Sequence, residues 1–124
     1  MEVSQALKQR RTIRKFENKK IPHEDLVKLV EYARCCAYPA NVQPLRFKII
    51  DDEKTLNEVF PCTKWAGYLA DGAPKEGEKP AAYIAVLGNK EVKGKFEVEA
   101  GCAICAMMTG AVDKGLGSCW LGAI

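Results

Sequence analysis

The segment from Ala100 to Val112 constrains the fold most, because its 13 residues are almost all apolar or small. Such a run is too short to span a bilayer and suits a buried helix. The surrounding sequence, KFEVEAGCAICAMMTGAVDKGLG, predicts one long helix that ends at Gly115 or Gly117, where glycine can adopt the αL conformation. A helix that is apolar all round must be covered all round. A chain of 124 residues offers little material for that, so we expect a partner subunit.

The remaining sequence alternates between helical and extended patterns. Apolar spacing predicts a short helix at 3–9, a second after Pro22 with an apolar face, and a third in EKTLNEVFP. RFKIID and AAYIAVLGN read as strands, and SCWLGAI as the start of another. Residues 61–80 read as a loop with one helical turn near 65–69. The apolar face of the second helix is expected to comprise Leu26, Val27, Val30, Ala33 and Cys36 or Ala37. This order predicts a single layered domain of the α+β or α/β class, spanning 1–124.

Positive charge is concentrated at one end of the chain. Residues 1–20 carry seven cations and two acidic residues, a sum of +5, so the other 104 residues sum to −2 within a total of +3. This asymmetry indicates an anionic partner near that end. A basic nucleic-acid-binding protein is a remote alternative, because aromatic residues for base stacking do not alternate with the cations. The sequence shows no signal peptide and no membrane span, so we expect a cytoplasmic protein with reduced thiols.

The sequence RRTIRKF, residues 10–16, packs four cations into seven positions. Guanidinium groups match phosphate oxygens in a forked, charge-assisted geometry, so Arg10, Arg11 and Arg14 are candidate phosphate ligands. The hydroxyl of Thr12 would add a donor. Solvated surface charge is the plainer interpretation. The apolar residues between the cations would anchor the turn, however, and a fixed cation cluster repels itself unless an anion neutralises it.

The sequence ANVQP, residues 40–44, carries a second candidate binding feature. In an extended chain Asn41 and Gln43 point the same way, and each amide has both a donor and an acceptor. Two such amides can read the edge of a heterocycle. The plainer alternative is an ordinary connection from a helix to a strand, where Asn and Pro are common.

Other catalytic motifs are absent from the sequence. The CAIC pair, Cys102 and Cys105, falls inside the predicted long helix and not at a helix start, so we interpret the thiols as core packing. No metal site is predicted, because His23 is the only histidine. There is no phosphate-binding P-loop, dinucleotide fingerprint or Ser/His/Asp set. Without acid–base residues, a bound cofactor is expected to carry the chemistry.

These residues resemble the nitroreductase family of flavoproteins along essentially the whole chain. The resemblance rests on four segments in the family's order: QALKQRRTIRKF, IPHEDLVKLVEYA, ANVQPLRF and EAGCAICAMMTGAVDKGLGSCWLGAI. It implies a three-layer α/β/α domain of the α+β class, with a mostly antiparallel central sheet and a long buried central helix. It also implies a homodimer that binds FMN at the subunit interface.

The resemblance implies an oxidoreductase that transfers electrons from NAD(P)H through FMN to a nitroaromatic, a quinone or a similar small acceptor, in a ping-pong cycle. The flavin-binding residues of the family correspond to three groups of residues in this chain. In the family, the second group usually contacts the flavin of the other subunit. The groups are Arg10, Arg11, Thr12 and Arg14; Pro39, Asn41 and Gln43; and Trp120, Leu121 and Gly122.

The sequence departs from the family pattern at a few positions. Pro39 stands where the family often has Ser, and Leu45 replaces the usual aromatic residue. The family continues past the last residue of this sequence, so we expect the domain to be incomplete at its C-terminal end. An alternative that follows is a flavin-binding module without turnover, or a truncated relic.

Overall fold

The computed structural model describes residues 1–124 and contains helices and two strands. The elements in chain order are α1 (Val3–Gln9), α2 (His23–Arg34), η1 (Pro39–Asn41), β1 (Leu45–Ile50), α3 (Glu53–Val59), η2 (Phe60–Cys62), β2 (Tyr83–Gly88) and α4 (Phe96–Asp113). None of the helices is both long and apolar enough to cross a membrane.

The two strands form an antiparallel sheet, in register from the pair Leu45 and Gly88 to the pair Ile50 and Tyr83. Side chains alternate between the two faces of a strand, so Phe47 and its partner Val86 share the face that packs on the core. The intervening Lys48 points to the other face and is exposed. The α+β class and the antiparallel pairing predicted for this chain are therefore confirmed.

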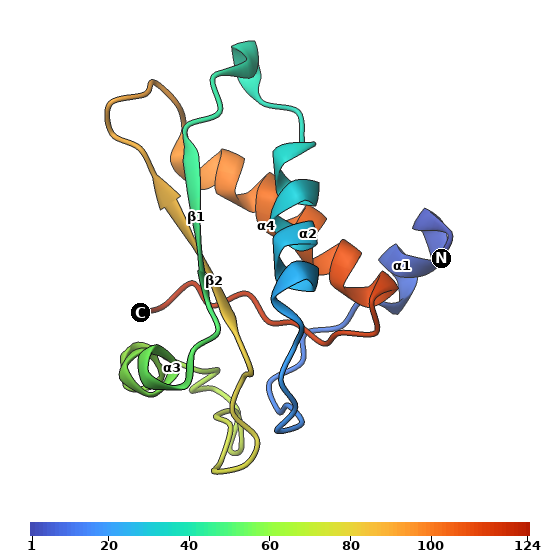
Figure 1. Cartoon of the computed structure of the whole chain (residues 1–124), viewed down its shortest axis with the longest axis vertical. Helices are drawn as coiled ribbons and strands as arrows, with labels where there is room; N and C mark the ends of the chain where they lie inside the picture. The colour runs from blue at the N-terminus through green and yellow to red at the C-terminus, as the bar shows by residue number, and fades with distance from the viewer.

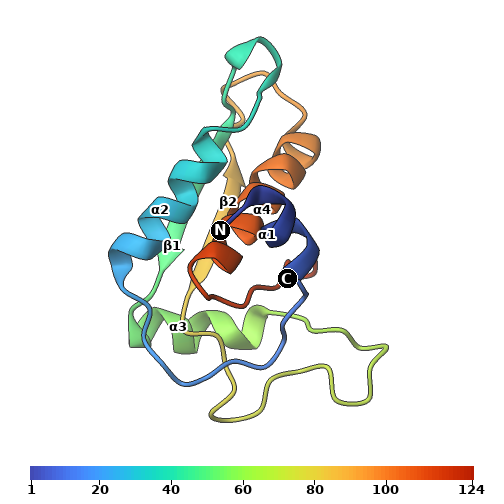
Figure 2. The same ribbon diagram turned by 90° about the vertical axis from the view of Figure 1, so that its right-hand side faces the viewer.

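The core lies where α2 and α4 cross beside the sheet (Figure 1). Its buried cluster consists of Leu29, Ala33, Leu45, Ala103, Met107 and Ala111. Small residues let the two helices approach closely: a Cβ added at Gly110 would lie 2.3 Å from the ring of Tyr32. Figure 2 shows α1 beside α4, so α4 contacts a helix on more than one side and forms the centre of the fold.

The long helix α4 has 18 residues and ends as predicted, with Gly115 at a φ of +69° just after it. Within this chain, however, one face of α4 remains uncovered. Ala103 is fully buried, whereas Val98, Cys102 and Cys105 are exposed along one helical face. The exposed face is mostly apolar, and the predicted dimer that would cover it is not part of this structure.

Three expectations for local structure are wrong. In α2 the buried residues are Leu26, Leu29 and Ala33, while Val27 is exposed, because the helix turns a slightly different face to α4. Residues 118–124 form no strand, since their backbone makes only an isolated parallel bridge between Thr12 and Ser118 and one hydrogen bond between Lys64 and Ala123. Residues 65–69 form no helix, only a hydrogen-bonded turn.

The interpretation of the cysteines as core residues is also wrong. All six are free, and none is buried in this chain. Cys102 and Cys105 fall on the uncovered face of α4, while Cys35 and Cys36 follow the end of α2. The Sγ of Cys36 lies 3.6 Å from the carbonyl oxygen of Cys102, so the end of α2 contacts the backbone of α4 there. Burial raises the pKa of Cys36, and the neighbouring thiols raise it further.

Candidate functional site

The segment 10–16 leaves α1 as an irregular chain in which Thr12 forms an isolated bridge. The guanidinium of Arg11 turns back to the end of the helix. It donates to the carbonyl oxygens of Lys8 at 2.6 Å and Arg10 at 2.8 Å. A cation bound to the last carbonyls of a helix is stabilised by the helix dipole. Arg11 therefore has a structural role in this chain besides its predicted one.

Ile13 and Phe16 attach this segment to neighbouring chain and not to the buried core, since Ile13 is exposed and Phe16 only partly buried. The N–H of Ile13 donates to the carbonyl of Ser118 at 2.9 Å, and its side chain lies so close to Gly117 that an added Cβ would be 3.1 Å away. Phe16 packs edge-on against Trp65, with the ring centroids 6.3 Å apart. The segment is thus held from both sides, and its cations occupy defined positions.

The cations of this segment differ in how they are compensated. Lys15 forms ion pairs with Asp71 and Glu78. Arg10, Arg11 and Arg14 form no ion pair with any carboxylate of this chain. Arg14 donates from Nη2 to the hydroxyl of Tyr68 at 3.2 Å, a neutral acceptor. Three guanidinium groups within five residues therefore remain without a counter-charge.

The chain that follows α4 lies beside this segment. The bridge between Thr12 and Ser118 joins the two. Burial raises the pKa of the Cys119 thiol, and the positive charge of Arg14 acts to lower it. Trp120 is half exposed and covers Gly101 of α4, at 3.6 Å from an added Cβ. The structure thus brings the cation segment and the chain around residue 118 together.

Leu121 and Gly122 continue this irregular chain. Leu121 is partly buried, while Gly122 is exposed. A Cβ added at Gly122 would have nothing within 4 Å, so the space above this backbone is open. The prediction that Gly122 allows close approach of a ring is compatible with this opening.

The two amides of the second group face each other. Gln43 donates from Nε2 to Oδ1 of Asn41 at 2.9 Å, and both side chains are exposed. The backbone is not extended, contrary to our expectation, because Ala40, Asn41 and Gln43 have φ angles of 51°, 52° and 51°. Non-glycine residues avoid this region, and such strain concentrates at functional sites. Pro39 is exposed at the start of η1.

The amide group lies far from the cation segment in this chain. Figures 1 and 2 both place η1 at the top of the molecule, whereas residues 10–16 run through its lower half. The structure therefore places the chain that leads into the third group beside the first group and leaves the second group apart. This separation agrees with the expectation that Asn41 and Gln43 serve the flavin of another subunit.

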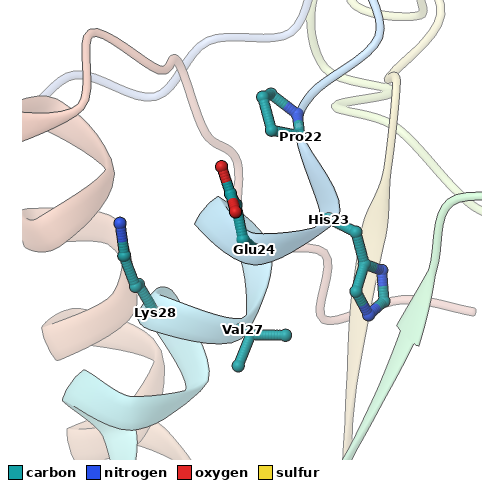
Figure 3. A pocket seen from close by; sticks show the side chains of 5 residues that line it. All are labelled: Pro22, His23, Glu24, Val27 and Lys28. Carbon is teal, nitrogen blue, oxygen red and sulfur yellow. The ribbon is translucent and has the colours of Figure 1, made fainter.

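A wide hollow at the start of α2 holds none of the predicted residues (Figure 3). It is lined by Pro22, His23, Glu24, Val27 and Lys28. His23, the one histidine, is engaged there by Oδ2 of Asp51, at 2.6 Å from its Nδ1. No residue of the cation segment lines this hollow. The hollow therefore adds no general acid or base to the cation segment and forms no catalytic set with it.

The donor set of the cation segment fits a phosphate ester. It offers uncompensated guanidiniums and the exposed hydroxyl-bearing side chain of Thr12. Sequence reasoning missed Asp71 and Glu78, which hold the neighbouring Lys15. The alternating acidic and basic residues of 71–79 indicate that ion pairs form there. A loop sequence does not specify, however, which distant lysine its carboxylates contact.

Comparison with known proteins identifies a family for this chain. A family model described as the nitroreductase family matches residues 7–94. A protein of Methanothermobacter thermautotrophicus assigned as an NADH dehydrogenase/NAD(P)H nitroreductase is 23% identical over 124 residues, covering 98% of this chain and 61% of its own. This chain thus spans about three fifths of the length of that curated relative.

Solved structures share the fold. A nitroreductase family protein of Clostridium novyi superposes with a TM-score of 0.81 at 25% identity, over 100% of this chain and 71% of its own. A protein of Desulfovibrio desulfuricans assigned as a nitroreductase was crystallised in complex with FMN. It superposes with a TM-score of 0.78 at 28% identity, over 99% of this chain and 69% of its own.

Proposed function

The chain belongs to the nitroreductase family, and we propose that it binds FMN and passes electrons from NAD(P)H through the flavin to a small acceptor such as a nitroaromatic or a quinone. The observation that supports this most strongly is the cation segment, with three guanidiniums that no carboxylate of the chain neutralises. The flavin phosphate would supply the missing negative charge.

Arg10, Arg14 and the hydroxyl of Thr12 would hold the phosphate, and Arg11 would add its charge from the end of α1. Arg–phosphate contacts are short, charge-assisted and often forked, which fixes the direction of the attached group. The anchors Ile13 and Phe16 keep these donors in place before the ligand arrives. Such preorganisation lowers the entropic cost of binding.

The turn at Trp120, Leu121 and Gly122 would face the ring system. When bound, the flavin supplies hydride acceptance and electron transfer, which no side chain of the site can provide. Gly122 leaves room for a planar group to lie against the backbone, because nothing of this chain occupies that space. In the proposed ping-pong cycle the donor leaves this open side before the acceptor enters.

We also propose that the chain works as a homodimer. The exposed apolar face of α4 and the exposed Val3 and Leu7 of α1 would then be covered. A partner would also bring its Pro39, Asn41 and Gln43 to the flavin held by the cation segment. The free thiols suit a reducing compartment, so we propose a cytoplasmic location.

The test is a visible absorption spectrum of the purified protein after addition of FMN, followed by anaerobic addition of NADH or NADPH. The proposal predicts bound flavin that bleaches with either donor and recovers its colour with a quinone or a nitroaromatic. A protein that binds FMN but does not bleach would support the alternative of a flavin-binding module without turnover. A protein that binds no FMN would contradict both.

A further inference from the structure

The loop of residues 63–79 lies against the cation segment and is tied to it by several different contacts. The N–H of Phe16 donates to the carbonyl of Glu78 at 2.9 Å. The ring of Phe16 packs on Trp65, whose Nε1–H donates to Thr63 Oγ1 at 2.9 Å. Tyr68, otherwise exposed, accepts from Arg14. Main chain, aromatic and polar contacts therefore join the same two segments.

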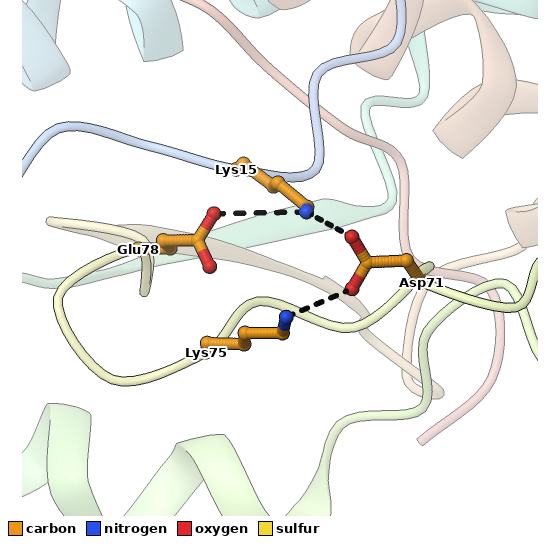
Figure 4. A network of polar contacts seen from close by, with 4 residues as sticks. All are labelled: Lys15, Asp71, Lys75 and Glu78. Carbon is orange, nitrogen blue, oxygen red and sulfur yellow. Dashed lines mark hydrogen bonds and ion pairs between the residues drawn. The ribbon is translucent and has the colours of Figure 1, made fainter.

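Lys15 is at the centre of this junction (Figure 4). Its ammonium bonds to Oδ2 of Asp71 and lies 3.8 Å from Oε2 of Glu78. The other oxygen of Asp71 lies 3.7 Å from Lys75 of the same loop. The hydrogen bond with Asp71 raises the pKa of Lys15, and Lys15 in turn lowers that of Asp71. Both groups are thus charged over the physiological pH range.

The loop itself is folded closely enough to transmit this attachment. Gly72 and Pro74 are buried although they lie in a loop. A Cβ added at Gly72 would lie 2.4 Å from the carbonyl oxygen of Ala66, so the two sides of the loop are in contact. Asp71 is next to this contact and therefore sits on a defined backbone.

We propose that Lys15 and Asp71 are positioning residues of the anion site: their ion pair docks the loop of residues 63–79 on the cation segment and so sets the spacing of Arg14 and its neighbours for a phosphate ester. Lys15 does not itself bind the anion in this arrangement, because its charge is engaged by two carboxylates. Arg14 is adjacent to Lys15 in sequence and contacts the same loop through Tyr68. The inference rests on the proposed function, since FMN is the ester considered.

The sign of the effect separates positioning from simple electrostatics. Removal of a carboxylate near a phosphate site weakens repulsion, so charge alone predicts tighter FMN binding for Asp71→Asn. Positioning predicts weaker binding. Exposed ion pairs are modest, so we expect the Kd for FMN to rise about two- to fivefold. Riboflavin lacks the phosphate, and its Kd should change much less.

The experiment measures the Kd of FMN and riboflavin by quenching of flavin fluorescence, for the wild type and three variants. Asp71→Asn breaks the ion pair with Lys15. Asp71→Glu keeps the negative charge and should retain most of the wild-type affinity for FMN. Glu76→Gln is the matched control, because it removes one carboxylate from the same loop. Glu76 pairs only with Lys79 of that loop and its side chain is 90% exposed. We expect it to leave FMN binding unchanged or slightly tighter.

Hydrogen exchange of the loop amides provides a second readout. The proposal predicts faster exchange across residues 66–79 in Asp71→Asn than in Glu76→Gln, and slower exchange in the wild type when FMN is added. Equal FMN affinity of the wild type and Asp71→Asn, or equal losses for FMN and riboflavin, would overturn the positioning role while the proposed function stands. A wild type that binds no FMN would overturn both.

Discussion

Arg14→Gln is the substitution that probes the cation segment most sharply. Arg14 has no carboxylate partner, and its one side-chain hydrogen bond goes to the hydroxyl of Tyr68 at 3.2 Å. Its acceptor, Tyr68, is neutral and exposed, so loss of the bond should change stability little. The full cost of the substitution therefore falls on the bound anion.

The magnitude follows from the type of contact. A hydrogen bond between charged groups contributes about 1.5–3 kcal/mol, which corresponds to a rise in the Kd for FMN of about 10- to 150-fold. Glutamine retains a donor of similar length, so the lower half of this range is expected. Because part of the interaction is Coulombic, the difference between wild type and variant should shrink as the salt concentration rises.

The assay is titration of FMN by fluorescence quenching at low and high salt. Lys90→Gln serves as the charge-matched control, since it removes one cation from the turn after β2, outside the cation segment. It should leave the Kd nearly unchanged. If Arg14→Gln raised the Kd less than about threefold, or no more than Lys90→Gln did, the guanidinium would not contact the phosphate and the reasoning would fail.

Three further predictions concern the core, the pH dependence and the exposed helix face. Leu29→Ala removes three carbon atoms from a side chain that is 6% exposed, so the free energy of unfolding measured in urea should fall by about 2.5–5 kcal/mol. The control Leu87→Ala truncates a half-exposed side chain and should lower it by less than about 1.5 kcal/mol. Equal losses for the two variants would contradict the assigned core. The hydrogen bond from Lys114 lowers the pKa of Asp25 in the folded protein. The stabilisation of the folded state by this pair is therefore fully present above the unfolded-state pKa of about 3.9, and it is lost as the pH falls through the lower folded-state pKa. The stability difference between wild type and Asp25→Asn should therefore close in acid, and a constant difference would refute the pairing. Cys102 should react with a thiol reagent in dilute protein and become protected at high protein concentration if a second copy covers α4; equal reactivity throughout would contradict that interface.

Elements with strong local signals were predicted well. The periodicity of residues 3–9, the prolines around η1 and the apolar run of α4 each specify their structure through short-range preferences. The stop at Gly115 was also readable, because glycine reaches a positive φ at no steric cost.

Features that depend on distant neighbours were not predictable. SCWLGAI has the composition of a strand, but without a pairing partner beyond Thr12 it remains an irregular chain. The thiols of α4 read as core residues because composition does not indicate which helical face meets α2. The left-handed backbone at Asn41 and Gln43 carried no glycine signal either, since the surrounding structure imposes it.

The candidate site shows the same division. Arg10, Arg11, Thr12 and Arg14 could be proposed from sequence because their residue types match a phosphate. The loop contacts of Lys15 and Arg14 join residues more than fifty positions apart, and only the fold reveals them. The turn of Arg11 back to the carbonyl of Lys8 likewise depends on where α1 ends.

Discrimination between FMN and riboflavin by the wild-type protein measures the role of the phosphate most directly. The two ligands share the ring system and differ in one phosphate ester, so their Kd ratio reports what the arginines contribute. If the cation segment binds that phosphate, FMN should bind at least about tenfold more tightly than riboflavin at low salt. Equal affinities for the two would show that the segment holds no phosphate and would contradict the site proposed for this chain.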